Sequence, residues 1–263
     1  MTSLSYTLTD SATMLRRNLR HALRYPAMTV SVIASPVFIL LLFVYVLGGA
    51  MAASATGHPD RSAYLAYIAP GVLLMTIASG IVPTAVAVCT DMSTGIIARF
   101  RTMAISRASV LTGHVLGSVI QTFITAALVL AVTVALGFRP SASAAGWLAA
   151  AGLGVLVAFA MTWLGVALGL VSKTPEGASN IGLPFTLVLP FLSSAFVPIG
   201  SLPAGVRWIA QNQPFTPFID TFRGLLAGTP IGHRGLVAVI WCAVIAGGSY
   251  LWSKSLYNRE PAN

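Results

Sequence analysis

Long apolar segments alternate along this chain with short polar ones. Each apolar segment holds about 20 residues or more, which is the length that an α-helix needs to cross the hydrocarbon core of a bilayer. None of them shows the apolar–polar alternation of an outer-membrane barrel strand. We therefore predict one all-α transmembrane domain over residues 1–263, with six transmembrane helices. The predicted spans are 27–50, 64–88, 109–137, 146–171, 179–199 and 235–254.

The polar stretch between the second and third predicted spans holds four charged residues, which are Asp91, Arg99, Arg101 and Arg107. Within it Ile96, Phe100 and Met103 or Ala104 recur at helical spacing. Asp91 and Ser93 can cap the start of a helix. This pattern predicts a short amphipathic helix over 91–104 at the cytoplasmic end of a transmembrane hairpin. The alternative is an ordinary basic loop that follows the positive-inside tendency.

The segment 8–25 separates its apolar and basic residues onto two faces of a helix. At 100° per residue, six apolar side chains fall on one narrow stripe. The opposite face holds Arg16, Arg17, Arg20 and Arg24. This pattern is typical of a helix that lies in the membrane interface with its arginines toward the lipid headgroups. The alternative is a plain basic tail.

The segment 200–234 is too apolar for a simple external loop and too broken for a span. In its second half, Thr216 can serve as N-cap, Pro217 as the first helical residue and Gly228 as the stop signal. These signals predict a short helix over 217–227.

Pro203 and Pro214 bracket a second short piece, which predicts a helix at about 204–212. We expect both short helices, within 204–227, to be re-entrant, dipping into the membrane from its outer surface. Asp220 and Arg223 stand at i and i+3, so they can neutralise each other there. The alternative is an interfacial loop that lies flat.

The composition supports a membrane protein, because 56% of the residues are hydrophobic, only 8% are charged and the mean hydropathy is +0.85. Soluble domains carry about 25% charged residues. The net charge of +9 is spread over short loops, so it indicates contact with anionic lipid headgroups and not with nucleic acid. With both termini inside, ten basic residues face inward and five outward, which predicts an N-in, C-in topology. The many arginines, alanines and glycines suggest a GC-rich bacterium, and hence its cytoplasmic membrane.

The sequence lacks the motifs of several other protein classes. Its four histidines, His21, His58, His114 and His233, are scattered and form no zinc-binding pair. It contains neither the phosphate-binding loop Gly-x-x-x-x-Gly-Lys-Ser/Thr nor the nucleophile motif Gly-x-Ser-x-Gly. No charged residue lies near the middle of a predicted span, although ion-driven transporters use such residues to bind the coupling ion. We therefore expect neither a membrane enzyme nor a secondary transporter, and no metal or cofactor in this chain.

Glycine pairs at four-residue spacing lie near the inner ends of the third and fourth predicted spans. They are Gly113 with Gly117, and Gly165 with Gly169. Such pairs allow two helix backbones to approach closely. They predict tight packing of the third span against the fourth.

Two stretches carry a resemblance to a known family. They are residues 91–113, DMSTGIIARFRTMAISRASVLTG, and residues 196–228, FVPIGSLPAGVRWIAQNQPFTPFIDTFRGLLAG. Together with the six spans and the interfacial helix, they resemble the membrane subunits of ABC-2 type transporters, in the daunorubicin-resistance branch of drug exporters. The resemblance covers nearly the whole chain. This sequence departs from it at Ala104, where members often have Pro, and at Gln213, where they often have Asn.

The resemblance implies a pump that is divided between two kinds of chain. A separate cytoplasmic ATPase, expected in two copies, binds ATP and Mg²⁺, and this chain pairs with a second membrane subunit, either a copy of itself or a close paralogue. The helix at 91–104 is then the coupling helix that docks on the ATPase. Its interface residues are Asp91, Gly95, Ile96, Arg99, Phe100, Arg101, Met103 and Arg107. The implied cargo is an amphiphilic drug, with a lipid-linked molecule or a glycan as the alternative.

The fifth predicted span offers small polar and aromatic side chains near Pro184 and Pro190. They are Phe185, Thr186, Ser193 and Ser194. Such a lining suits amphiphilic cargo that is taken partly from the membrane, so we predict that these residues line the translocation route. The alternative is that they pack against neighbouring spans.

Overall fold

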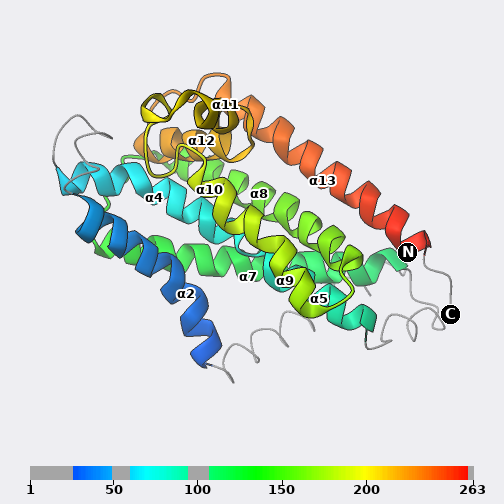
Figure 1. Ribbon diagram of the computed structural model, residues 1–263. Helices are drawn as coiled ribbons and strands as arrows, with labels where there is room; N and C mark the ends of the chain where they lie inside the picture. Colours follow the sequence, from blue (N-terminus) through cyan, green and yellow to red (C-terminus); the bar gives the residue numbers. More distant parts are fainter. Residues whose placement is uncertain (1–25, 49–59, 94–106, 260–263) are drawn as a thin grey trace.

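The computed structural model describes residues 26–48, 60–93 and 107–259, and every regular element within these ranges is a helix (Figure 1). The elements are α2 (Pro26–Leu41), η1 (Leu42–Leu47), α4 (Arg61–Ala78), α5 (Ile81–Ser93), α7 (Arg107–Ala135), α8 (Ala144–Val171), α9 (Pro175–Leu183), η2 (Pro184–Val188), α10 (Leu189–Phe191), η3 (Ile199–Ser201), α11 (Ala204–Asn212), α12 (Phe215–Ala227) and α13 (Arg234–Arg259). The all-α prediction is confirmed for this part of the chain. The predicted interfacial helix at 8–25 lies outside it, as do residues 94–104 of the predicted coupling helix.

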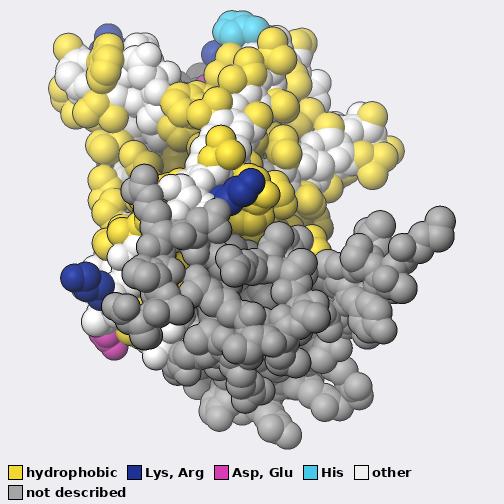
Figure 2. Space-filling model, turned by 90° about the vertical axis from the view of Figure 1, so that its right-hand side faces the viewer, with side chains coloured by type: hydrophobic (Ala, Val, Ile, Leu, Met, Phe, Trp, Pro, Cys, Tyr) yellow, Lys and Arg dark blue, Asp and Glu magenta, His cyan; other side chains and the backbone are white. Residues whose placement is uncertain are grey.

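Four of the described helical segments are long and apolar enough to cross a membrane, which makes this a multi-pass membrane protein. They are Arg61–Ser93, which comprises α4 and α5, and Val115–Ala135, Ala144–Val171 and Arg234–Leu256. Hydrophobic side chains cover most of the described surface seen in Figure 2, as expected for helices that face lipid. The first and fifth predicted spans correspond to shorter helices that π-helical turns interrupt, at η1 and η2. The number of six spans therefore stays a prediction.

The second predicted span, 64–88, is both longer and less regular than expected. It begins at Arg61, where the carboxylate of Asp60 accepts the N–H of Ser62 at 2.9 Å and caps the helix. It breaks at Ser79–Gly80, and α5 then continues to Ser93. Pro83 contributes to this break because it has no N–H to donate to the carbonyl of Ser79 four residues earlier.

The fifth predicted span, 179–199, is wrong at both ends. Helix α9 already begins at Pro175, because the Thr174 hydroxyl accepts the N–H of Gly177 at 3.1 Å as an N-cap. The helical stretch ends at Phe191, at the close of α10. Between them lies the π-helical turn η2, in which the N–H of Leu189 bonds to the carbonyl of Pro184. The last eight residues of the predicted span are therefore not part of a membrane-crossing helix.

Helix α8 is the centre of the bundle and packs against α4, α5, α7, α9, α12 and α13. Its glycine pair faces α5 and not α7, so the predicted contact between the third and fourth spans is wrong for these residues. A Cβ at Gly165 would lie 2.7 Å from the carbonyl oxygen of Ile81, and one at Gly169 would lie 2.5 Å from that of Ala85. The two glycines thus allow α8 to lie directly against the backbone of α5.

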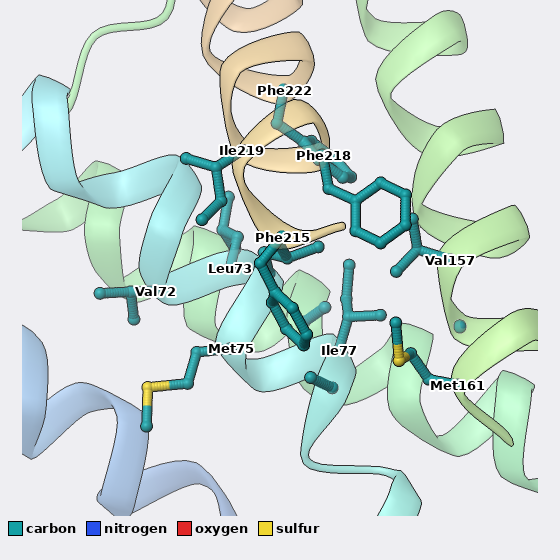
Figure 3. Packing of buried hydrophobic residues seen from close by; sticks show 14 of the residues in the cluster. Val72, Leu73, Met75, Ile77, Val157, Met161, Phe215, Phe218, Ile219 and Phe222 are labelled. Carbon is teal, nitrogen blue, oxygen red and sulfur yellow. The ribbon is translucent and has the colours of Figure 1, made fainter. Parts of the chain in front are cut away.

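Helix α12 fills the space between α4 and α8 (Figure 3). Its aromatic and aliphatic side chains point between Leu73 and Ile77 of α4 and Val157 and Met161 of α8. The buried members of this set are Phe215, Phe218, Ile219, Phe222 and Leu226, each no more than 5% exposed. A helix that contributes five core side chains is part of the bundle, so the alternative of a loop lying flat on the surface is wrong.

Candidate functional site

A cavity of about 600 Å³ lies between α2, the junction of α4 and α5, α7 and η2. The lining residues lie near the middle of these helices. Gln121 is the central residue of α7, and Ser79–Gly80 lie close to the centre of Arg61–Ser93. Among the residues that the structure describes, none of those that line it is Asp, Glu, Lys or Arg. Hydroxyl and amide groups supply its polarity.

Helix α7 presents a polar stripe to this cavity. It consists of Ser118, Gln121, Thr122 and Thr125, which follow one another at i, i+3, i+4 and i+7. This spacing places all four on one face of the helix. None of the four is among the residues predicted from the sequence, although the spacing rule that finds apolar faces also shows a polar stripe in the middle of an apolar span.

The junction of α4 and α5 supplies hydrogen-bond acceptors to the same cavity. The hydroxyls of Thr76, Ser79 and Thr84 donate to the backbone carbonyls of Val72, Thr76 and Gly80, at 2.8, 2.7 and 2.8 Å. The hydroxyls of Thr76 and Ser79 therefore use their only proton within their own helix and keep oxygen lone pairs for another partner. The Thr84 hydroxyl also lies 3.0 Å from Ser118 Oγ of α7, which is its partner across the cavity wall. This side of the cavity is consequently rich in acceptors.

Of the four predicted route residues, only Thr186 lines this cavity. Phe185 lies on the opposite side of η2, where it borders an apolar cavity of about 340 Å³ beside α8 and α13. Ser193 and Ser194 are buried and lie beyond the end of α10. Their hydroxyls donate to the Pro190 carbonyl and to Asp220 respectively. Ser193 thus closes the turn after the helix, and Ser194 joins that turn to α12, so both buried hydroxyls have the partners that they need.

An ion-pair cluster joins α12 to α4 and to the turn after α10. The predicted pair is present, with Arg223 Nη1 at 2.9 Å from Asp220 Oδ1. The guanidinium also donates to the carbonyls of Tyr67 and Ser194, at 3.3 and 2.7 Å, and lies 4.0 Å from the centre of the Tyr67 ring. Arg234 approaches the other oxygen of Asp220 at 3.5 Å. One arginine thus ties together three segments that are far apart in the sequence.

The ends of the two short helices are set by prolines and a glycine. Helix α11 begins after Pro203, and α12 ends at Gly228, whose φ of 66° is left-handed as in a glycine C-cap. The predicted N-cap Thr216 is wrong, and so is Pro217 as the first helical residue, because the carbonyl of Pro214 already accepts the N–H of Phe218 and α12 begins at Phe215.

Thr216 and Gln213 instead connect the short helices to their surroundings. The Thr216 hydroxyl donates to the carbonyl of Ala210 in α11 at 2.5 Å. The Gln213 amide donates to the carbonyls of Leu189 and Leu192 at 3.3 and 3.4 Å. The unusual glutamine therefore satisfies carbonyls at the end of the fifth helical stretch, which need external partners.

The predicted coupling residues lie mostly outside the described part of the chain. Gly95, Ile96, Arg99, Phe100, Arg101 and Met103 are all outside it. Asp91 belongs to the last turn of α5, so the prediction that it caps a separate helix is wrong. Arg107 is the first residue of α7. The interfacial arginines at 16, 17, 20 and 24 are also outside the described residues.

Comparison with protein families matches most of the chain, up to the end of α12, to one family. The model of the ABC-2 type transporter family matches residues 10–227. This range includes the cavity, both short helices and the pair of Asp220 with Arg223. The chain belongs to the ABC-2 type transporter family. The bundle described above is therefore the membrane part of an ABC transporter, that is, a permease subunit.

Curated relatives of this permease share most of its length. It is 28% identical over 246 residues to the daunorubicin resistance ABC transporter permease protein DrrB1 of Streptomyces coeruleorubidus, covering 93% of this chain and 83% of that protein. It is 24% identical over 216 residues to the probable doxorubicin resistance ABC transporter permease protein DrrC of Mycobacterium tuberculosis, covering 82% and 76%. The predicted family is thus confirmed.

Proposed function

We propose that this permease subunit exports amphiphilic drugs, using ATP that a separate subunit hydrolyses. The observation that carries this proposal is the family match over residues 10–227, together with relatives whose names refer to daunorubicin and doxorubicin resistance. Both relatives align with the greater part of their own length, so the likeness extends over the transmembrane bundle as a whole.

The cavity between α2, α4–α5, α7 and η2 supports an amphiphilic cargo. Its volume of about 600 Å³ falls in the range of about 300–1,000 Å³ that is typical of small-molecule sites. Hydroxyl and amide groups from α7 and the α4–α5 junction alternate on its wall with Ile39, Met75 and Leu187. A molecule with an apolar body and a few polar groups matches such a wall.

In this proposal the pump contains two membrane subunits and two copies of a cytoplasmic ATPase. The ATPase binds ATP and Mg²⁺, and the segment 91–104 transmits its movement to the membrane subunit through Phe100 and the neighbouring arginines. The subunit crosses the bacterial cytoplasmic membrane six times with both termini inside. Helices α11 and α12 lie at the outer side, where α12 reaches back into the bundle.

The proposed function is tested by asking whether ATP drives transport of the drug. We expect inside-out membrane vesicles that contain this chain and its ATPase to accumulate daunorubicin when ATP is added. Accumulation should continue when an ionophore collapses the proton gradient while ATP is maintained, because no charged residue in the described spans lines the cavity to carry a coupling proton. An ATPase partner with its catalytic carboxylate removed is the control and should abolish accumulation.

A different outcome would assign the chain to another class of transporter. The second experiment imposes a pH gradient, in the absence of ATP, on vesicles that contain this chain alone. Accumulation of daunorubicin under those conditions would identify a secondary transporter and overturn the proposal.

A further inference from the structure

Gln121 carries the one side-chain amide among the described residues that line the central cavity. It is exposed at the middle of the apolar helix α7. Its backbone carbonyl accepts from the Thr125 hydroxyl at 3.0 Å, but its side-chain amide forms no hydrogen bond with any other described residue. A primary amide without a partner is unfavourable in an apolar environment. Its position therefore indicates a partner that the chain itself does not supply.

Thr122, the next residue of α7, also has a polar side chain without a partner among the described residues. The residue is 7% exposed and lines the cavity, and its hydroxyl likewise makes no hydrogen bond with any described residue. Its hydroxyl faces the break at Gly80, where a Cβ would lie 2.5 Å from Thr122 Oγ1. Two neighbouring residues of α7 thus supply unpaired hydrogen-bonding groups to the cavity. Thr76 and Ser79 supply acceptors to the same cavity.

We infer that the cavity binds the uncharged, hydroxyl- or carbonyl-bearing part of an amphiphilic cargo, and that Gln121 determines this specificity. The inference rests on the proposed export function and adds the chemical class of the cargo. The Gln121 amide both donates and accepts, so it can pair with a hydroxyl or with a carbonyl. The hydroxyl oxygens of the α4–α5 junction accept from donors on the other side of the ligand.

The lining of this cavity also disfavours binding of a charged group of the cargo. A cation would lose its water without gaining a carboxylate, because none of the described lining residues is acidic. The cavity should therefore distinguish a neutral molecule from its cationic counterpart. The Gln121 side chain is the place where a single substitution can alter this preference.

The test compares daunorubicin, which carries a primary amine, with its uncharged N-acetyl derivative in the inside-out vesicles described above. The wild type should accumulate the N-acetyl derivative at least as well as daunorubicin. Gln121→Leu should lower the accumulation of the N-acetyl derivative by about two- to tenfold, the range expected for one lost hydrogen bond. Gln121→Glu should raise the ratio of daunorubicin to N-acetyl derivative by about fivefold or more, because a carboxylate pairs with the amine.

Two further variants separate specificity from folding. Gln211→Leu makes the same change at an exposed position of α11 and should match the wild type. Gln121→Asn retains the amide and should keep more activity than Gln121→Leu. Accumulation is divided by the basal ATPase rate of the same vesicles, and cross-linking of paired membrane subunits is measured in parallel.

The outcomes are distinct. Unchanged accumulation of both probes by Gln121→Leu and Gln121→Glu would overturn the inference while leaving drug export intact. Loss of subunit cross-linking in these variants would also overturn it, since Gln121 would then serve the contact between subunits. Failure of the wild type to accumulate either probe with ATP would remove the proposed function itself.

Discussion

At the scale of single residues, Arg223 joins three segments of the chain, whereas the sequence pattern predicts only its pairing with Asp220. Its guanidinium, 23% exposed, pairs with Asp220, donates to two backbone carbonyls and stacks on Tyr67. We expect Arg223→Leu to destabilise the protein by about 2 kcal/mol, because Asp220 loses its closest cation and the carbonyls lose their donors. In a thermal unfolding measurement in detergent, this corresponds to a fall in Tm of about 4 °C.

The control for this prediction is Arg139→Leu. Arg139 is exposed and donates to a single carbonyl, that of Val134, at 3.2 Å. Its loss should change Tm by about 1 °C or less. Arg223→Lys should fall between the two, since an ammonium cannot form the forked contacts of a guanidinium. Equal Tm values for Arg223→Leu and Arg139→Leu would show that the cluster contributes little to stability.

At the scale of elements, α12 is a core helix in which Ala227, its last residue, is the only one that is exposed. Ala227 is exposed and Leu225 half-buried, whereas Ile219 is fully buried. In a background without Cys89 and Cys242, a membrane-impermeant maleimide added from outside should label Ala227→Cys at least about tenfold faster than Ile219→Cys. The physical reason is that a buried thiol reacts only when the helix opens.

Leu225→Cys provides the intermediate position in this series. Its rate should lie between those of Ala227→Cys and Ile219→Cys, so that the rate falls along the helix away from Gly228. Uniform, rapid labelling at all three positions would mean that this segment does not pack between α4 and α8 in the membrane. Labelling from the inside only would reverse the proposed orientation.

At the scale of the whole molecule, the permease must receive movement from its ATPase through a cytoplasmic surface. The sequence offers the amphipathic segment 91–104, which lies between two predicted spans, for this role. We predict that Phe100→Asp, or Arg99→Glu combined with Arg101→Glu, leaves the chain in the membrane but reduces co-purification of the ATPase. A buried aromatic anchor at an interface contributes about 2 kcal/mol or more, so affinity should fall at least about thirtyfold.

Arg139→Glu on the proposed outer side serves as the matched charge reversal. It should leave co-purification and ATPase stimulation unchanged, because the ATPase cannot reach that side of the membrane. If the coupling variants also retain full co-purification and stimulation, the assignment of 91–104 to the ATPase interface is wrong.

Local signals in the sequence determined much of the architecture. Long apolar segments predict membrane helices because the bilayer requires every backbone polar group to bond within its own segment. The ends at Pro203 and Gly228 and the pair of Asp220 with Arg223 follow from backbone conformation and i, i+3 spacing. These features depend on neighbours in the chain, so the sequence alone was sufficient for them.

The tertiary structure decided which surfaces meet. Gly165 and Gly169 lie against α5, Ser194 bonds to Asp220, and α5 continues through Asp91. The cavity around Gln121 exists because a break in one helix, a π-helical turn in another and a polar stripe on α7 come together. Helical periodicity defines the faces of each helix, but the partner of each face depends on the packing of distant segments, which no local pattern contains.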